Sequence, residues 1–66
     1  MKEYMELNNF LKIKGFASTG GQAKLIIRAG KVKVNGSVDT RNKKKLVNGD
    51  KVEYLDKVYV VNLDEF

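Results

Sequence analysis

Residues 22–36 read QAKLIIRAGKVKVNG, and the spacing of the apolar residues changes once within this stretch. In its first half, Ala23, Ile26 and Ile27 lie three and four positions apart, which is the spacing of one face of a helix. In its second half, charged and apolar residues alternate over residues 31–34, as they do in a strand with one face in water. A helix that leads directly into a strand is therefore predicted here.

Both ends of the predicted helix carry residues that usually mark them. Thr19 and Gln22 fit a capping box, in which the threonine hydroxyl accepts a hydrogen bond from an amide of the first turn and the glutamine reaches back. Gly30 stands where a glycine commonly ends a helix. The helix is expected over about residues 20–29.

The strand is followed by Asn35-Gly36, a strong signal for a hairpin turn. A two-residue turn would place Val38 on the same face as Lys33, which is a poor arrangement for an apolar residue. A three-residue loop with Gly36 as a bulge residue instead pairs Val32 with Val38 on the core face. We therefore expect the bulged hairpin.

The flanking segments complete one domain over residues 1–66. A short helix is predicted over residues 6–14, because Leu7, Phe10 and Leu11 recur at helical spacing and Gly15 follows. The fold class is therefore α+β, with two N-terminal helices packed on a small antiparallel sheet. The other expected elements are an edge strand at residues 4–5, a return to the core at 46–47, a turn at 48–50, a strand at 51–55, a hairpin turn at 56–57 and a strand at 58–61, while 62–66 are left unassigned.

The composition excludes several classes of function. The 66 residues contain no cysteine and no histidine, which excludes disulfides and thiolate zinc sites and removes the commonest general base. The longest apolar runs span three or four residues, too short for a membrane helix or a signal peptide. We therefore expect no catalysis, no metal and no cofactor. A cytoplasmic location is expected because the chain begins at Met1 without a leader.

The positive charge is concentrated in the middle of the chain. Residues 12–45 contain ten basic residues and a single acid, Asp39, for a net charge of +9. The flanking residues 1–11 and 46–66 carry −1 and −3. Such segregation is typical of a surface that binds a polyanion, although a basic surface also serves solubility.

The outward face of the predicted second helix is a candidate phosphate site. At about 100° per residue, Gly20, Lys24 and Arg28 fall within about 80° of one another, with Gly21 just beyond. Lys24 and Arg28 repel each other at this spacing unless an anion lies between them. The two glycines leave the first helical amides open, which favours a phosphate. An ordinary solvated helix face is the alternative interpretation.

Two further basic clusters follow this helix. Lys31 and Lys33 project from one face of the predicted strand, and residues 41–45 form a polar basic loop. Taken alone, such a loop is an ordinary solvated segment. If the hairpin packs beside the helix, however, all three clusters rim a single groove.

Several short strings resemble the S-four RNA-binding domain, or alpha-L motif, which is named after ribosomal small-subunit protein four. The resemblance covers about residues 6–54, and it is most like the small stand-alone bacterial proteins of the YbcJ/YaaA kind. Its most specific part is the Ala-Lys of the helix followed by Gly and Val-x-Val-Asn-Gly. The matching strings are Phe10-Leu11, Gly15, Gln22-Ala23-Lys24, Gly30-Lys31-Val32-Lys33-Val34-Asn35-Gly36 and Asn48-Gly49-Asp50.

The resemblance implies an RNA surface formed by the two helices and the start of the sheet. One departure is Gly20, since many members carry an arginine between two small hydroxyl residues at this position. The backbone amides and the loop at residues 41–45 are expected to compensate. By position the resemblance implicates Lys12, Lys14, Thr19, Gln22, Lys24, Arg28, Lys31 and Lys33. The open helical amides add Gly20 and Gly21, and the charge pattern adds Arg41, Lys43, Lys44 and Lys45.

The expected partner is structured RNA, with ribosomal RNA as one candidate, bound by a monomer. Phe10 and Phe16 are assigned to the core, and Tyr54 and Tyr59 lie in the acidic half, so recognition should depend on backbone shape and phosphate rather than on stacked bases. The alternative is a protein-interaction module for an acidic partner. Duplex DNA is disfavoured because the sequence predicts no helix long enough to serve as a recognition helix with base-reading side chains.

Overall fold

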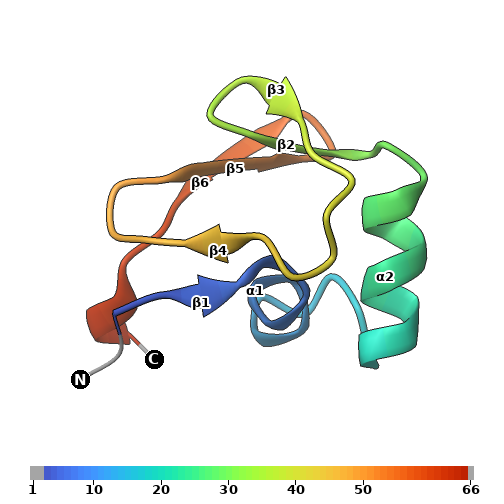
Figure 1. Cartoon of the computed structure of the whole chain (residues 1–66), viewed down its shortest axis with the longest axis horizontal. Helices are drawn as coiled ribbons and strands as arrows, with labels where there is room; N and C mark the ends of the chain where they lie inside the picture. Colours follow the sequence, from blue (N-terminus) through green and yellow to red (C-terminus); the bar gives the residue numbers. More distant parts are fainter. Residues whose placement is uncertain (1–2, 66) are drawn as a thin grey trace.

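The computed structural model describes residues 3–65, with the backbone alone at Glu65, and shows two α-helices packed with short antiparallel strands (Figure 1). The strands form a four-stranded sheet, ordered β3-β2-β5-β6, and a separate pair of β1 with β4. The predicted α+β class is confirmed. The elements are β1 (Met5–Glu6), α1 (Leu7–Ile13), α2 (Gly20–Arg28), β2 (Val32–Val34), β3 (Ser37–Val38), β4 (Lys45–Leu46), β5 (Lys51–Tyr54), β6 (Lys57–Val60) and the 3₁₀ helix η1 (Leu63–Glu65).

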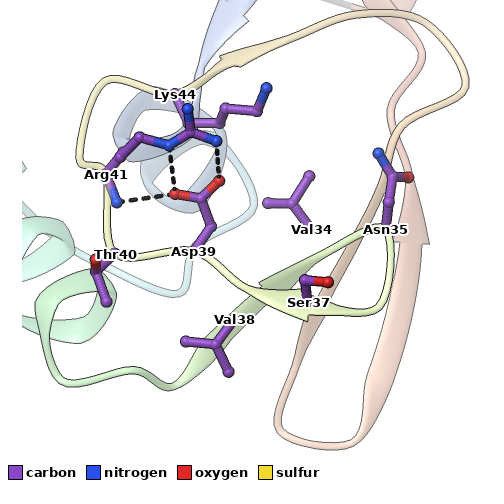
Figure 2. A pocket seen from close by; sticks show the side chains of 8 residues that line it. All are labelled: Val34, Asn35, Ser37, Val38, Asp39, Thr40, Arg41 and Lys44. Carbon is purple, nitrogen blue, oxygen red and sulfur yellow. Dashed lines mark hydrogen bonds and ion pairs between the residues drawn. The ribbon is translucent and has the colours of Figure 1, made fainter.

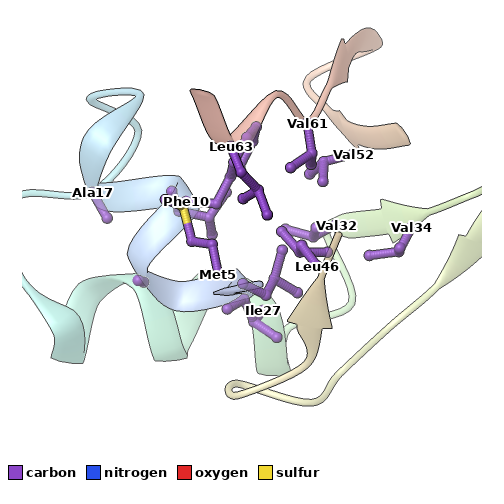
Figure 3. Packing of buried hydrophobic residues seen from close by; sticks show 13 residues of the cluster. Met5, Phe10, Ala17, Ile27, Val32, Val34, Leu46, Val52, Val61 and Leu63 are labelled. Atoms are coloured by element: carbon purple, nitrogen blue, oxygen red, sulfur yellow. The ribbon is translucent and has the colours of Figure 1, made fainter. Parts of the chain in front are cut away.

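The core joins both helices to the inward face of the four-stranded sheet (Figure 3). Leu7, Phe10 and Leu11 are fully buried, as their helical spacing predicted. Because α2 buries Ala23 and Ile27, its opposite face is left in solvent. The other buried apolar residues of the cluster are Met5, Ala17, Val32, Val34, Leu46, Val52, Val61 and Leu63.

The ends of α2 are fixed by the residues that predicted them. The Thr19 hydroxyl accepts a hydrogen bond from the Gln22 amide at 3.1 Å, and Gln22 Oε1 accepts one from the Ser18 amide at 2.7 Å. Gln22 thus accepts from the amide of Ser18, one residue before the Thr19 amide that a capping box would use. At the other end Gly30 has a φ of 76°, in the left-handed region that ends helices.

The β2–β3 hairpin differs from its prediction. Asn35 and Gly36 form a two-residue turn with φ values of 53° and 87°, as in a type I′ hairpin. Lys33 therefore pairs with Val38, and the expected bulge pairing of Val32 with Val38 is wrong. Val38 lies on the outer face of the sheet and is 53% exposed.

Hydrogen bonds from the turn to β5 explain the tighter hairpin. The Asn35 amide donates to the Lys51 carbonyl at 2.7 Å, and the Lys51 amide donates back to Asn35 Oδ1 at 2.9 Å. Asn35 Nδ2 also donates to Asp50 Oδ1 at 3.1 Å. Each bond contributes about 1 kcal/mol, so together they match the roughly 1.5–3 kcal/mol from burying one valine.

Three smaller differences follow from local geometry. The β5–β6 turn is Leu55-Asp56, both with positive φ, one residue earlier than expected. Leu46 is fully buried but Val47 is 47% exposed, because successive strand residues face opposite sides. The N-terminal strand is β1 rather than residues 4–5. In the unassigned tail, Leu63 of η1 is buried, and Phe66 lies outside the described residues.

Candidate nucleic-acid interface

The outward face of α2 carries the predicted phosphate-site residues. Gly21, Lys24 and Arg28 are exposed and Gly20 is partly exposed. A Cβ at Gly20 would meet nothing within 4 Å, so packing does not require glycine there. Leu25, which the sequence did not single out, is 72% exposed on the same helix, adjacent to Lys24 in the chain.

The first turn of α2 combines occupied and open amides. The Gln22 amide is taken by the Thr19 hydroxyl, and the Ala23 amide makes the first intrahelical bond, to the Thr19 carbonyl at 3.0 Å. The amides of Gly20 and Gly21 precede that bond at the positive end of the helix dipole. The side chains of Thr19 and Gln22 therefore serve first to shape this turn.

The basic residues of α1 lie at its C-terminal end. Lys12 is exposed in the last turn, and Lys14 is the residue that follows the helix. The Lys14 ammonium lies 5.7 Å from the centre of the Phe10 ring. Phe10 itself is fully buried, as predicted, so the ring fixes the lysine rather than offering a stacking surface.

The strand cluster is less basic than the sequence indicated. Lys31 and Lys33 are exposed, but β5 places Glu53 directly opposite Lys33. Both lysines line a depression of about 370 Å³ that also contains Glu53 and Asp56. Antiparallel pairing thus brings the acidic C-terminal half against the basic middle, which no local charge count could reveal.

The predicted basic loop at residues 41–45 is anchored by two of its backbone carbonyls, and its last residue, Lys45, belongs to β4. The first amides of α1, from Leu7 and Asn8, donate to the carbonyls of Lys44 and Asn42 at 2.9 and 3.1 Å. The loop therefore closes the N-terminus of α1 and is not a free solvated segment. Its side chains line a separate depression of about 460 Å³, formed by Arg41, Lys43, Lys44 and Lys45.

Asp39 and Arg41 form a bidentate ion pair at the start of this loop (Figure 2). Arg41 Nε donates to Asp39 Oδ1 at 3.0 Å and Nη2 donates to Oδ2 at 2.7 Å. The hydrogen-bonded guanidinium holds the pKa of the Asp39 carboxyl below its ordinary value of 3.8, against the opposing effect of its burial. In the sequence Asp39 was only the single acid of a basic stretch, so this role was missed.

Three aromatic rings from distant parts of the chain form a cluster. Phe16, in the loop before α2, lies with its ring centre 5.1 Å from those of Tyr54 and of Tyr59. All three are half-buried and pack against the core. This agrees with the assignment of Phe16 to the core, and it ties the loop before α2 to β5 and β6.

The described residues contain neither a cluster suited to a metal ion nor a helix suited to span a membrane. Among their side chains, no group of three or more His, Cys, Asp or Glu residues could hold a metal ion. No helix in this part of the chain is both long and apolar enough to cross a bilayer.

Comparisons with known proteins concern this same domain. The family model described as the S4 domain matches residues 1–62, from the N-terminus to just beyond β6. The chain is 43% identical over 51 residues to the Escherichia coli (strain K12) protein named "Putative RNA-binding protein YbcJ", covering 77% of this chain and 73% of that protein. It has the same identity and coverage with the Shigella flexneri protein named "Uncharacterized protein YbcJ".

Proposed function

The chain belongs to the S4 domain family, and from this premise we propose that it is a non-enzymatic module that binds structured RNA, with ribosomal RNA as one candidate. The observation that carries the proposal is the outward face of α2, where Lys24 and Arg28 are exposed along the helix that Gly20 and Gly21 begin. The printed name of the Escherichia coli relative supports RNA as the ligand.

Around this centre, the proposed RNA surface includes the C-terminal end of α1 and the anchored loop at residues 41–45. Lys12 and Lys14 extend it at the end of α1. The cations of the loop at residues 41–45 compensate, in this proposal, for the arginine that Gly20 replaces. Lys31 and Lys33 contribute less, because Glu53 and Asp56 share their depression. The module acts as a cytoplasmic monomer in this proposal.

Binding should depend on shape and phosphate rather than on base stacking. The half-buried rings of Phe16, Tyr54 and Tyr59 are engaged with one another, so they offer no open platform for successive bases. A folded RNA hairpin, whose backbone presents a fixed array of phosphates, should bind more tightly than an unstructured strand of the same length.

The test measures fluorescence anisotropy with three labelled probes of equal length: an RNA hairpin, an unstructured RNA and duplex DNA. The hairpin should bind most tightly at low salt. In parallel, proteins captured from a lysate by the immobilised chain should be lost after nuclease treatment. Absence of hairpin binding at low salt, together with an acidic protein captured even after nuclease, would favour the protein-interaction alternative instead.

A further inference from the structure

The Asp39–Arg41 pair has features that general basicity does not explain. Asp39 is a buried acidic residue, with 9% of its surface exposed, whereas the Arg41 side chain is 68% exposed. Asp39 Oδ1 also accepts from the Arg41 backbone amide at 2.9 Å. The buried carboxylate of Asp39 thus holds Arg41 in two ways, by one edge of its guanidinium and by its backbone amide.

The pair leaves one edge of the guanidinium free. A guanidinium has five N–H donors in a fixed plane. Asp39 takes the Nε donor and one donor of Nη2, which are the side edge of the plane. The outer edge still presents one N–H from Nη1 and one from Nη2, side by side. Two parallel donors at this spacing match two adjacent acceptors.

The backbone beneath Arg41 is fixed as well. The Asp39 amide donates to the Val32 carbonyl at 3.1 Å, and the Lys44 amide donates to the Arg41 carbonyl at 3.2 Å. Lys44 and Thr40 lie with Arg41 in a depression of about 450 Å³ (Figure 2). The free donor edge therefore stands on an anchored loop beside a hollow that can receive a ligand group.

The carboxylate also changes what Arg41 can contribute. Because Asp39 neutralises most of the arginine's charge at long range, the pair adds little to general attraction for a polyanion. The contribution that remains is directional hydrogen bonding. A guanidinium that is already held in place loses less side-chain entropy when it makes two further hydrogen bonds. The pair is therefore suited to selecting a ligand geometry rather than to raising affinity for any negative surface.

We propose that Arg41 is a specificity-determining residue of the RNA surface and that Asp39 is its positioning residue, so that the outer guanidinium edge binds two adjacent acceptors of RNA. These acceptors are two oxygens of one phosphate or O6 and N7 of one guanine, which present the same chemistry. This inference rests on the proposed function, and it assigns to a buried acid a role in binding a polyanion.

The test uses RNA hairpins with one common stem and loops of only G, only A or only U. Arg41→Lys keeps the charge but removes the fork of donors. It should weaken hairpin binding about tenfold. If all three hairpins are weakened equally, the acceptor is a phosphate, and if only the G-loop hairpin is weakened, it is a guanine. Unchanged binding by Arg41→Lys to every hairpin overturns the inference.

Asp39→Asn and Asp64→Asn provide a matched pair for the positioning role. Both remove one negative charge, and Asp64 lies on the exposed surface of η1. General electrostatics predicts that both variants bind RNA more tightly. If Asp39 positions Arg41, Asp39→Asn should instead weaken binding about threefold or more, while Asp64→Asn should not. Equal tightening by the two variants overturns the positioning role.

Two controls keep the inference separate from folding and from the proposed function. The NMR signal of the Arg41 Nε–H should be slowly exchanging in the unmodified chain and exchange rapidly in Asp39→Asn, with the remaining amide signals retained. Should Asp39→Asn fail to fold, Arg41→Lys decides alone. If the unmodified chain binds no hairpin, the proposed function is refuted. If it binds and Arg41→Lys leaves the affinity unchanged, only the present inference is refuted.

Discussion

Gly36 shows how a single residue can determine a hairpin. Its φ of 87° lies in a region that residues other than glycine rarely adopt, and a Cβ there would meet nothing within 4 Å. Gly36→Val should therefore act through backbone strain alone and lower the free energy of unfolding by about 1 kcal/mol or more. Urea denaturation should show this as a lower midpoint with an unchanged slope.

Gly20→Ala is the matched control for this prediction. It also adds a Cβ in open space, but its backbone φ is not positive and it begins α2. Alanine favours helix over glycine, so stability should be unchanged or slightly higher. If both substitutions leave the midpoint where it is, the turn does not need the conformation of glycine.

Asp39 should give the domain a specific dependence on acid. Arg41 holds the folded pKa of Asp39 below 3.8, so the unfolded chain binds the proton more readily. The stabilisation from this carboxylate is thus complete above about pH 5 and falls as pH drops below about 3.8 toward the folded pKa.

This dependence can be isolated by comparing the unmodified chain with Asp39→Asn. The difference in their free energies of unfolding should be constant from about pH 7 to pH 5 and should shrink below about pH 4. Arg41→Gln should remove most of the same effect, because the guanidinium causes the shift. A difference that stays constant to the lowest pH measured would show that the ion pair does not form in solution.

At the scale of elements, the sequence predicted the helices, because residues within or next to each helix specify it. The spacing of Leu7, Phe10 and Leu11 and the capping residue Thr19 are local signals, and both helices form close to where these place them. The β2–β3 register could not be predicted in this way. It depends on hydrogen bonds from Asn35 to Asp50 and Lys51, about 15 residues away. The sequence prediction rested instead on the burial of Val38.

The basic face of α2 is the element on which the proposed function depends. Replacing Lys24 and Arg28 by Gln should leave stability unchanged or slightly raised, since it removes a repulsion of a few tenths of a kcal/mol. The double substitution should weaken binding to an RNA hairpin. It should also make the slope of log affinity against log salt shallower by about 1 to 2, because each lost phosphate contact contributes about 0.7–0.9.

Lys51 and Lys57 provide the control for net charge. Both are exposed on β5 and β6, outside the proposed surface, and their replacement by Gln removes the same charge. This second double variant should bind RNA nearly as well as the unmodified chain. Equal weakening by the two variants would mean that net charge, and not the α2 face, determines binding.

At the scale of the whole molecule, the sequence located the positive charge but not its neighbours. The +9 segment predicted a basic surface, yet folding places Glu53 opposite Lys33 and Asp39 on Arg41. The basic residues of the loop and of β2 line two different depressions. Such contacts depend on strand pairing and loop closure, which composition and periodicity do not encode.

The pairing of charges bears on the last prediction, the salt dependence of RNA binding by the intact domain. With part of the positive charge neutralised, about four to six phosphates remain to be contacted by the α2 face, the end of α1 and the lysines of the loop. The slope of log affinity against log salt should then be about −3 to −5, as counterions are released from each phosphate. Titrations of one RNA hairpin at several salt concentrations measure this slope directly. Binding that does not change with salt would refute the electrostatic basis of the proposed surface, since exposed cations on a folded domain must release counterions when they meet phosphate.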